Sequence, residues 1–202
     1  MSTEAQPDDW APLTPDEVKA LLAELPIRWW IAGGWAIDLF LGRRTRPHGD
    51  TDVLIRRQDQ GAVQDYLFDW DLYKTHQPGL KPWPKGEVLG PGVNDIWCRR
   101  TSESPWRLQL MLLDTSGDSW VFRRNPTIAG PLDAIGRFTP SGIPYLAPEI
   151  QLLYKAKDST LEKNEADFRA VLPYLAPKAR DWLRQCLNRC FPGGHPWLDR
   201  PW

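Results

Sequence analysis

The sequence predicts an α+β protein, with a mixed β-sheet flanked by helices in the N-terminal part and a helical region after it. Short apolar runs with strand-like alternation are interspersed with helical patterns up to about residue 125, whereas residues 147–190 have helical patterns almost throughout. Hydrophobic residues make up 42% of the chain, enough for a packed core and too many for disorder. We expect residues 1–142 to form the α/β domain and residues 143–202 a helical region packed on it.

The first helix is predicted from its capping residues. Thr14-Pro15-Asp16-Glu17 gives an N-cap threonine, a proline at the first helical position and a glutamate three residues after the cap. Apolar residues then follow at helical spacing. We therefore expect a helix over residues 14–25, preceded by a loose arm over residues 1–12.

The remaining elements are predicted from apolar periodicity and from glycine and proline stops. Strands are expected over 27–32, 50–55, 70–75, 94–99, 106–113 and 119–123. Further helices are expected over 35–41, 58–68, 147–157, 161–172 and 177–190. The segment 77–92 is rich in proline and glycine, so we expect a long loop there.

Charge and composition narrow the classes of partner. The chain has 25 basic and 26 acidic residues, whereas a protein that neutralises nucleic-acid phosphates usually has a basic excess, so we expect no nucleic-acid partner. No stretch approaches the roughly twenty apolar residues that span a bilayer, and the acidic N-terminus fits no signal or transit peptide. We expect a cytoplasmic protein without a membrane partner; the oligomeric state is left open.

The densest chemical signal lies between residues 33 and 52. Gly33-Gly34 stands between a strand and a helix, where backbone amides can approach a phosphate closely and the helix dipole favours negative charge. Asp50 and Asp52 stand two apart on the next expected strand, so both carboxylates can face one side and hold one or two Mg²⁺ ions. The segment before them supplies positive charge that can offset a leaving pyrophosphate: Arg43, Arg44, Arg46 and His48.

Each part of this pattern has a simpler explanation when taken alone. A Gly-Gly pair after a strand is most often a turn, and an Asp-x-Asp pair is most often a solvated strand edge. Their combination in a fixed order within twenty residues favours a nucleotide site.

Four segments, Trp30 to Asp38, Gly42-Arg43, Thr45-Arg46 and His48-x-Asp50-x-Asp52, carry a family resemblance. The sequence resembles the DNA polymerase β-like nucleotidyltransferases, specifically the small aminoglycoside and lincosamide O-nucleotidyltransferases that confer antibiotic resistance. The resemblance implies a mixed sheet flanked by helices, bound Mg²⁺ with ATP or another NTP, and transfer of a nucleoside monophosphate to a hydroxyl of a small molecule. It implies that Asp50 and Asp52 are catalytic metal ligands. The nucleotide-binding residues that it implies are Gly33, Gly34, Arg43, Arg46 and His48.

One departure from the family pattern concerns a third carboxylate, which such enzymes usually carry on a later strand to bind metal or to deprotonate the acceptor. Residues 106–114 look like that strand, and Gln109 stands where the acid is expected. An amide is a poor general base and a weak metal ligand. Asp114 at the strand end and Asp95 on the neighbouring strand are candidate catalytic substitutes, which the sequence does not rank.

The helical region supplies the last candidates. Lys155 and Lys157 lie near one end of a helix and are candidates to reach a nucleotide phosphate, although a solvated helix face explains them equally well. Lys163 and Asp167 lie four apart and can simply pair. Three tryptophans are candidates to line an acceptor site, with core packing the better explanation for at least two: Trp83, Trp97 and Trp120.

Two other functions remain open from the sequence. A nucleotidyltransferase of this kind can modify a protein or an RNA instead, as toxin–antitoxin relatives do. A nucleotide-binding pseudoenzyme without turnover is the other, and Gln109 is its main support. The preferred NTP and the acceptor, whether an aminoglycoside, a lincosamide or another hydroxyl compound, cannot be read from the residues.

Overall fold

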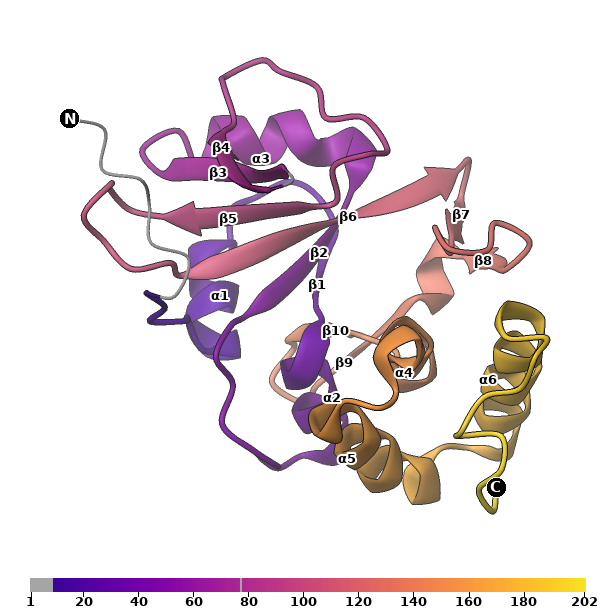
Figure 1. Ribbon diagram of the computed structural model, residues 1–202. Coiled ribbons are helices and arrows are strands. Elements are labelled where there is room, and N and C mark those ends of the chain that lie inside the picture. Colours follow the sequence, from indigo (N-terminus) through magenta and orange to yellow (C-terminus); the bar gives the residue numbers. More distant parts are fainter. Residues whose placement is uncertain (1–8, 77) are drawn as a thin grey trace.

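The computed structural model describes residues 9–76 and 78–202, and it confirms the predicted α+β class (Figure 1). Residues 1–8 of the expected arm and residue 77 of the expected loop lie outside the described residues. In the described part of the chain the strands follow the order β4-β3-β5-β6-β2-β1-β10-β9, and β7 and β8 continue from the end of β6. Parallel and antiparallel pairs both occur, so the sheet is mixed.

The strands are β1 (Trp29–Ile31), β2 (Asp52–Arg56), β3 (Asp71–His76), β4 (Gly79–Pro82), β5 (Asp95–Arg99), β6 (Leu108–Ser116), β7 (Ser119–Val121), β8 (Ala129–Pro131), β9 (Gly136–Phe138) and β10 (Pro144–Leu146). The helices are α1 (Pro15–Leu21), α2 (Gly33–Leu41), α3 (Gln60–Tyr66), α4 (Pro148–Lys155), α5 (Glu162–Val171) and α6 (Pro177–Cys190). Short 3₁₀ turns precede α3 and follow α4 and α5.

The predicted helix starts are confirmed more closely than their ends. Thr14 caps α1 through the expected capping box, but the helix ends at Leu21 rather than at residue 25. α2 ends at Leu41 and is closed by Gly42 in the left-handed conformation, as predicted. The start of α1 is fixed by the Thr14 capping box, whereas its end depends on which tertiary contacts continue, so α1 stops before the strand that follows it.

Two expectations about strands were wrong. The segment 77–92 is not wholly a loop, because β4 pairs antiparallel with β3 as an edge strand; backbone pairing at an edge tolerates proline and needs no apolar pattern. The predicted strand 50–55 begins only at Asp52, so Asp50 precedes the sheet. The three-residue strands β8, β9 and β10 are too short for a periodic signal and were not predicted.

The sheet core lies around β2. Its Val53, Leu54 and Ile55 are buried, between the parallel neighbour β6 and the antiparallel neighbour β1. α2 follows β1 directly and α4 follows β10 closely; because β1 and β10 are parallel neighbours, the two helices start at the same end of the sheet. This arrangement places the start of α2 beside the start of β2.

α4, α5 and α6 gather with the C-terminus on one side of the molecule, while α1 and α3 lie elsewhere along the sheet (Figure 1). The ring of Trp197 stacks on Phe168 of α5 at 4.4 Å and fastens the chain end to the helices. Since β10 pairs with both β1 and β9, strand pairing extends as far as Leu146. Among the described residues, no helix is both long and apolar enough to cross a membrane.

Candidate active site

The glycine pair brings Asp52 and the loop before it against the start of α2. Gly33 has φ +65°, and a Cβ there would overlap the Asp52 carboxylate, so a larger residue would be both strained and in collision. A Cβ on Gly34 would lie 2.5 Å from Nη2 of Arg46 and from Nδ1 of His48. Both glycines therefore have a packing role in addition to any contact with phosphate.

Two other carboxylates, those of Asp50 and Asp95, act on Asp52 at the start of β2. Asp52 is half-buried, and its own burial and the negative charges of Asp50 and Asp95 raise its pKa to about 7, although Lys155 and Lys163 oppose the shift. Burial also raises the pKa of Asp95. No described residue forms a hydrogen bond or an ion pair with the side chain of Asp50 or Asp52, so the negative charge here lacks a close partner.

Strand register places Gln109 between Asp52 and Asp95. Asp52 and Gln109 are direct partners across the parallel strands β2 and β6, so their side chains lie on the same face. Gln109 Nε2 donates a hydrogen bond to Oδ1 of Asp95 at 3.0 Å. The amide at the expected third-carboxylate position thus holds a carboxylate from the neighbouring strand.

Asp114 does not join this group. It lies five residues beyond Gln109 on β6, about 17 Å along an extended strand, and an odd separation places it on the other face. Its Oδ1 accepts a hydrogen bond from Nε of Arg57 at 2.5 Å. Of the two substitutes suggested by the sequence, the structure brings only Asp95 to Asp52.

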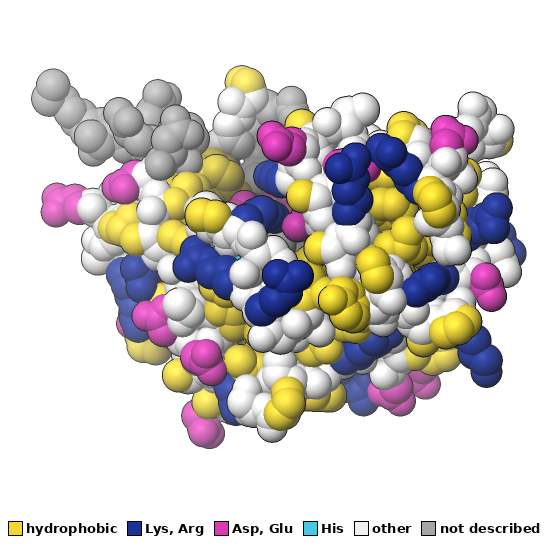
Figure 2. Space-filling model, turned by 90° about the horizontal axis from the view of Figure 1, so that it is seen from below, with side chains coloured by type: hydrophobic (Ala, Val, Ile, Leu, Met, Phe, Trp, Pro, Cys, Tyr) yellow, Lys and Arg dark blue, Asp and Glu magenta, His cyan; other side chains and the backbone are white. Residues whose placement is uncertain are grey.

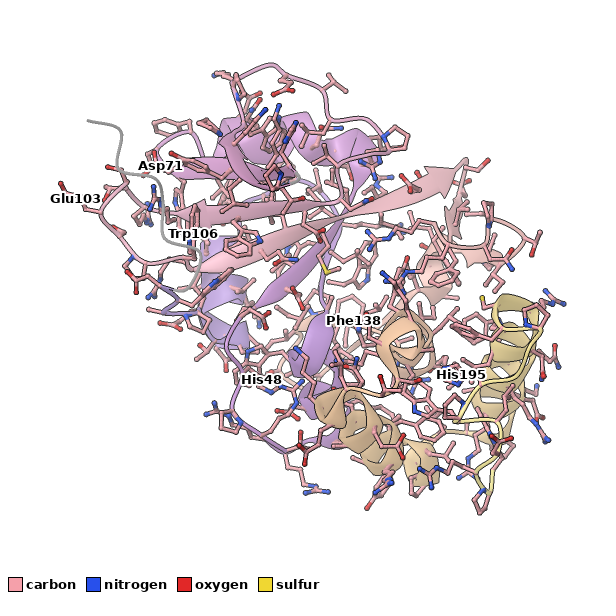
Figure 3. The ribbon with its side chains drawn as sticks, viewed as in Figure 1. His48, Asp71, Glu103, Trp106, Phe138 and His195 are labelled. Atoms are coloured by element: carbon pink, nitrogen blue, oxygen red, sulfur yellow. The ribbon has the colours of Figure 1, made fainter. Side chains whose placement is uncertain are left out.

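His48 belongs to a buried network rather than to an open surface. Its Nε2 lies 2.6 Å from Oδ2 of Asp38, and Arg46 Nη1 lies 3.2 Å from its Nδ1. Arg46 can only donate, so Nδ1 is the acceptor, and Nε2 carries the proton and donates it to Asp38; the tautomer is assigned from this network. Burial lowers the pKa of His48, consistent with a neutral ring. In Figure 3 His48 lies beside α2, whereas Trp106 lies near the start of β6.

The loop from Gly42 to Asp50 is tied to the helical region through Asp167. Arg46 Nη2 lies 3.3 Å from Oδ2 of Asp167, and Lys155 Nζ lies 2.9 Å from the same oxygen. The Asp167 side chain is 2% exposed. The sequence suggested that Asp167 pairs with Lys163; that pairing was wrong, because Asp167 is turned inward while Lys163 is exposed.

The remaining predicted cations differ in their surroundings. Lys155 is 10% exposed and also donates to Asn164 Oδ1 at 3.3 Å. Lys157 and Arg43 are exposed, and the side chain of neither forms a hydrogen bond or an ion pair with a described residue. On the face seen in Figure 2, Lys and Arg side chains are spread out with acidic side chains between them.

Sequence reasoning did not name Gln151, Arg123 or Arg124, and it named Lys163 only as a partner of Asp167. Gln151 Oε1 of α4 accepts from the Gly33 amide at 2.8 Å, so that amide is already bonded. Lys163 acts on the charge of Asp52, and Arg123 and Arg124 act on that of Asp95. Only the adjacent arginines gave any sequence signal, since their partners come from distant parts of the chain.

The two pockets described here do not contain the candidate carboxylates. A pocket of about 610 Å³ lies between α1 and the β9–β10 edge, and another of about 550 Å³ lies between α1 and Trp70. Neither includes Asp50, Asp52 or Asp95 in its lining. The candidate site is therefore defined by its chemistry.

The donor set fits Mg²⁺ bound partly by substrate. Asp50 and Asp52 supply carboxylates that no described residue pairs with; burial first, and the charge of Asp50 second, raise the pKa of Asp52, and a divalent cation would offset both effects. Across the described residues, no three His, Cys, Asp or Glu side chains are placed to hold one ion together. Mg²⁺ commonly takes one or two carboxylates and completes its coordination with phosphate oxygens and water.

The segment that carries the glycine pair and the two aspartates also matches a protein family. Residues 16–77 match the model of the aminoglycoside-2''-adenylyltransferase family, which covers less than half of the chain but includes Gly33, Gly34, Asp50 and Asp52. No curated protein sequence matches the chain.

Solved structures share the fold at low sequence identity. The solution structure of the antibiotic-resistance factor ANT(2'')-Ia is 14% identical, with TM-score 0.59 and coverage of 88% of this chain and 91% of that one. A crystal structure of ANT(2'')-Ia with adenylyl-2''-tobramycin is 15% identical, with TM-score 0.55 and coverage of 86% and 95%. The lincomycin-bound lincosamide adenylyltransferase LnuA is 17% identical, with TM-score 0.56 and coverage of 81% and 97%.

The fold is that of the nucleotidyltransferases, and the matched family is one of adenylyltransferases; together they indicate a nucleotidyltransferase. The resemblance to the aminoglycoside and lincosamide enzymes, first drawn from residues 30–52, is confirmed by the family match and the shared fold.

Proposed function

We propose that this protein transfers a nucleoside monophosphate from an NTP, by family resemblance ATP, to a hydroxyl group of a small molecule. The observation that carries the proposal is the unpaired Asp50–Asp52 carboxylate pair against the glycine start of α2, with Asp95 beside it. The adenylyltransferase family match over residues 16–77 supports it. The cytoplasmic location expected from the sequence is part of the proposal.

The site has two ends. The glycine end comprises Gly33, Gly34 and Lys155, and the aromatic end comprises Asp95, Trp97 and Tyr73; Asp52 and Gln109 stand between them. At the glycine end, the Gly33 amide is bonded to Gln151, and the next amides of the first turn of α2, those of Gly34 and Trp35, favour a triphosphate. Lys155 and Lys163 add positive charge there, as their effect on Asp52 indicates.

Asp50 and Asp52 would hold Mg²⁺, which when bound neutralises phosphate charge and orients the triphosphate. Arg46 and His48 fix the loop that carries Asp50, through Asp167 and Asp38 respectively, and so position the metal ligands. Arg43 and Lys157 are exposed and remain candidates to contact the nucleotide from outside.

Asp95 is the proposed proton acceptor for the attacking hydroxyl. Its raised pKa makes it a better base than an ordinary carboxylate, and Gln109 holds one of its oxygens while the other is left for the acceptor. In the transfer, the acceptor oxygen bonds to the α-phosphorus, the bond from the α-phosphorus to the bridging oxygen breaks, and pyrophosphate leaves. The hydroxyl proton passes to Asp95.

The experiment that tests the function measures pyrophosphate release and product mass with Mg²⁺, each of the four NTPs, and a panel of aminoglycosides and lincosamides. We expect a metal-dependent mass increase of one nucleoside monophosphate, which Asp50→Asn abolishes. Asp65→Asn is the matched control, because Asp65 is an exposed aspartate of α3 that pairs with Lys85 at the surface. MgATP binding without turnover on any acceptor would instead favour a pseudoenzyme or a macromolecular acceptor.

A further inference from the structure

A continuous row of side chains leads from the metal-ligand pair across the sheet. Tyr73 pairs with Trp97, Trp97 with Gln109, and Gln109 with Asp52, so all four lie on one face of adjacent strands. Asp95 shares this face because it lies two residues from Trp97. Neighbouring strands are about 4.8 Å apart, so the two aromatic residues are the next neighbours of Gln109 on the side away from Asp52.

The aromatic residues form a platform on a buried base. Trp97 lies 4.9 Å from the Trp10 ring and 5.5 Å from the Trp106 ring, and Tyr73 also lies 5.5 Å from Trp106. Trp106 is 1% exposed, whereas Trp10, Trp97 and Tyr73 are each half-buried. The sequence offered Trp83, Trp97 and Trp120 as acceptor contacts; Trp83 and Trp120 are buried core residues, which leaves Trp97.

The charges around the platform are mixed. The Arg99 guanidinium lies 4.5 Å from the Trp106 ring and 5.3 Å from the Tyr73 ring. Asp71 is ion-paired with Arg99 at 3.6 Å, so its charge is already balanced. Arg123 and Arg124 act on Asp95 from another side. Arg99 and Asp71 balance each other, so beside Asp52, Asp95 is the carboxylate on this face of the described strands that has no ion pair with a described residue.

We propose that Tyr73, Trp97 and Trp10 bind the acceptor, and that the acceptor is an uncharged or singly charged glycoside rather than a polycationic aminosugar. The inference rests on the proposed function. The apolar face of a sugar ring packs well on an aromatic ring, and this contact needs no carboxylate. A polycation would instead meet the positive charges of Arg123 and Arg124, which act on Asp95, while the Asp71 carboxylate is already paired with Arg99.

The order of the row assigns the platform to the acceptor rather than to the nucleobase. The proposed triphosphate site is on the glycine side of Asp52, whereas Trp97 lies beyond Gln109 on the opposite side. The attacking hydroxyl has to reach both Asp95 and the α-phosphorus near Asp52. A sugar resting on Trp97 has a hydroxyl next to Asp95, two residues along the same strand.

The test compares acceptor and nucleotide constants in the full-length protein. The acceptors are a panel of uncharged or singly charged glycosides, lincomycin among them, and tobramycin as the polycation. For Trp97→Ala we expect the acceptor KM and calorimetric Kd to rise at least about tenfold, with the KM for MgATP unchanged. Trp97→Phe keeps a ring and should lose much less. Phe138→Ala, which removes a 69% exposed ring at the distant β9 edge, is the control.

Several outcomes would overturn the inference. A rise in the MgATP constant alone would assign the platform to the nucleobase, and unchanged constants in Trp97→Ala would make it purely structural. Tobramycin used as efficiently as the best glycoside, or no binding of any glycoside in the panel, would refute the acceptor class. The proposed function fails separately, if wild-type protein with Mg²⁺ and any NTP transfers nothing to either acceptor type or if Asp50→Asn is fully active.

Discussion

The glycine end and the aromatic end of the site are built in different ways. The glycine end comes mainly from one short segment, residues 33–52, whose loop is fastened by the buried contacts of Asp38 and Asp167. The aromatic end comes from the two strands β3 and β5, and only their register with each other and with β6 brings Tyr73 and Trp97 beside Gln109. Buried ion pairs therefore hold one end, whereas backbone pairing holds the other, and the two should fail differently on mutation.

The largest expected effect is a loss of stability when the buried ion pairs of Asp167, which hold the loop of the glycine end, are removed. Asp167→Ala leaves Lys155 and Arg46 without their shared partner, and breaking such a buried pair costs about 3–5 kcal/mol of unfolding free energy. Asp65→Ala, whose ion pair with Lys85 is exposed on both sides, should cost less than about 1 kcal/mol. Chemical denaturation of both variants measures the two losses of unfolding free energy. Equal losses would show that the ion pairs of Asp167 with Arg46 and Lys155 do not hold the loop in place.

The next largest effect is a loss of activity on mutation of Asp52, which lies between the glycine end and the aromatic end. Asp52→Asn keeps the size of the side chain but removes a proposed metal ligand, so we expect kcat to fall by about 10²–10³-fold. Because the variant also removes a carboxylate that no described residue pairs with, its fold should be at least as stable as wild type without metal. A kcat near the wild-type value in initial-rate measurements would argue that the metals bind elsewhere.

At the aromatic end, Asp95→Asn should lower kcat by about 10²-fold, because it removes the proposed proton acceptor while Gln109 remains. Asp114→Asn breaks only the contact with Arg57 and should stay close to wild type. Adding Gln109→Asp to Asp95→Asn should restore part of the rate, since residue 109 is the register partner of Asp52. The reverse ranking of the Asp95 and Asp114 variants would move the base to the other side of β6.

The smallest effect is a pH dependence of stability without metal. The pKa of Asp52 is about 7 in the folded state, against 3.8 for an ordinary aspartate. The folded state therefore keeps an extra proton between about pH 4 and 7, so the stability present at pH 4 is lost as the pH rises through 7. We expect this loss to be on the order of 2 kcal/mol, after allowing for partial exposure of the group.

The check is the unfolding free energy of wild type and Asp52→Asn, measured from pH 4 to pH 8 in a chelator. The difference between the two isolates Asp52 from the other carboxylates, and Mg²⁺ at pH 8 should restore stability to wild type only. Parallel pH profiles for the two proteins would mean that Asp52 titrates normally.

Much of the glycine end was predictable from the sequence because its parts are contiguous. The capping box at Thr14, the glycine stop after β1 and the Asp-x-Asp pair each depend on residues a few positions apart. Their order also carried the family resemblance. The sequence did not show that Gly33 and Gly34 are needed to admit Asp52, Arg46 and His48, since that requires knowing which atoms meet.

The sequence by itself determined the α+β class, most of the elements, and Asp50 and Asp52 as the candidate metal ligands, because periodicity, caps and short motifs are local. Tertiary structure alone decided that Asp95 rather than Asp114 lies beside Gln109, that Asp167 pairs with Lys155 and Arg46, and that Trp97 is the tryptophan beside the site. The physical reason is that strand register and helix packing join residues distant along the chain. In the strands, a register shift of one residue would turn Asp95 and Trp97 to the opposite face.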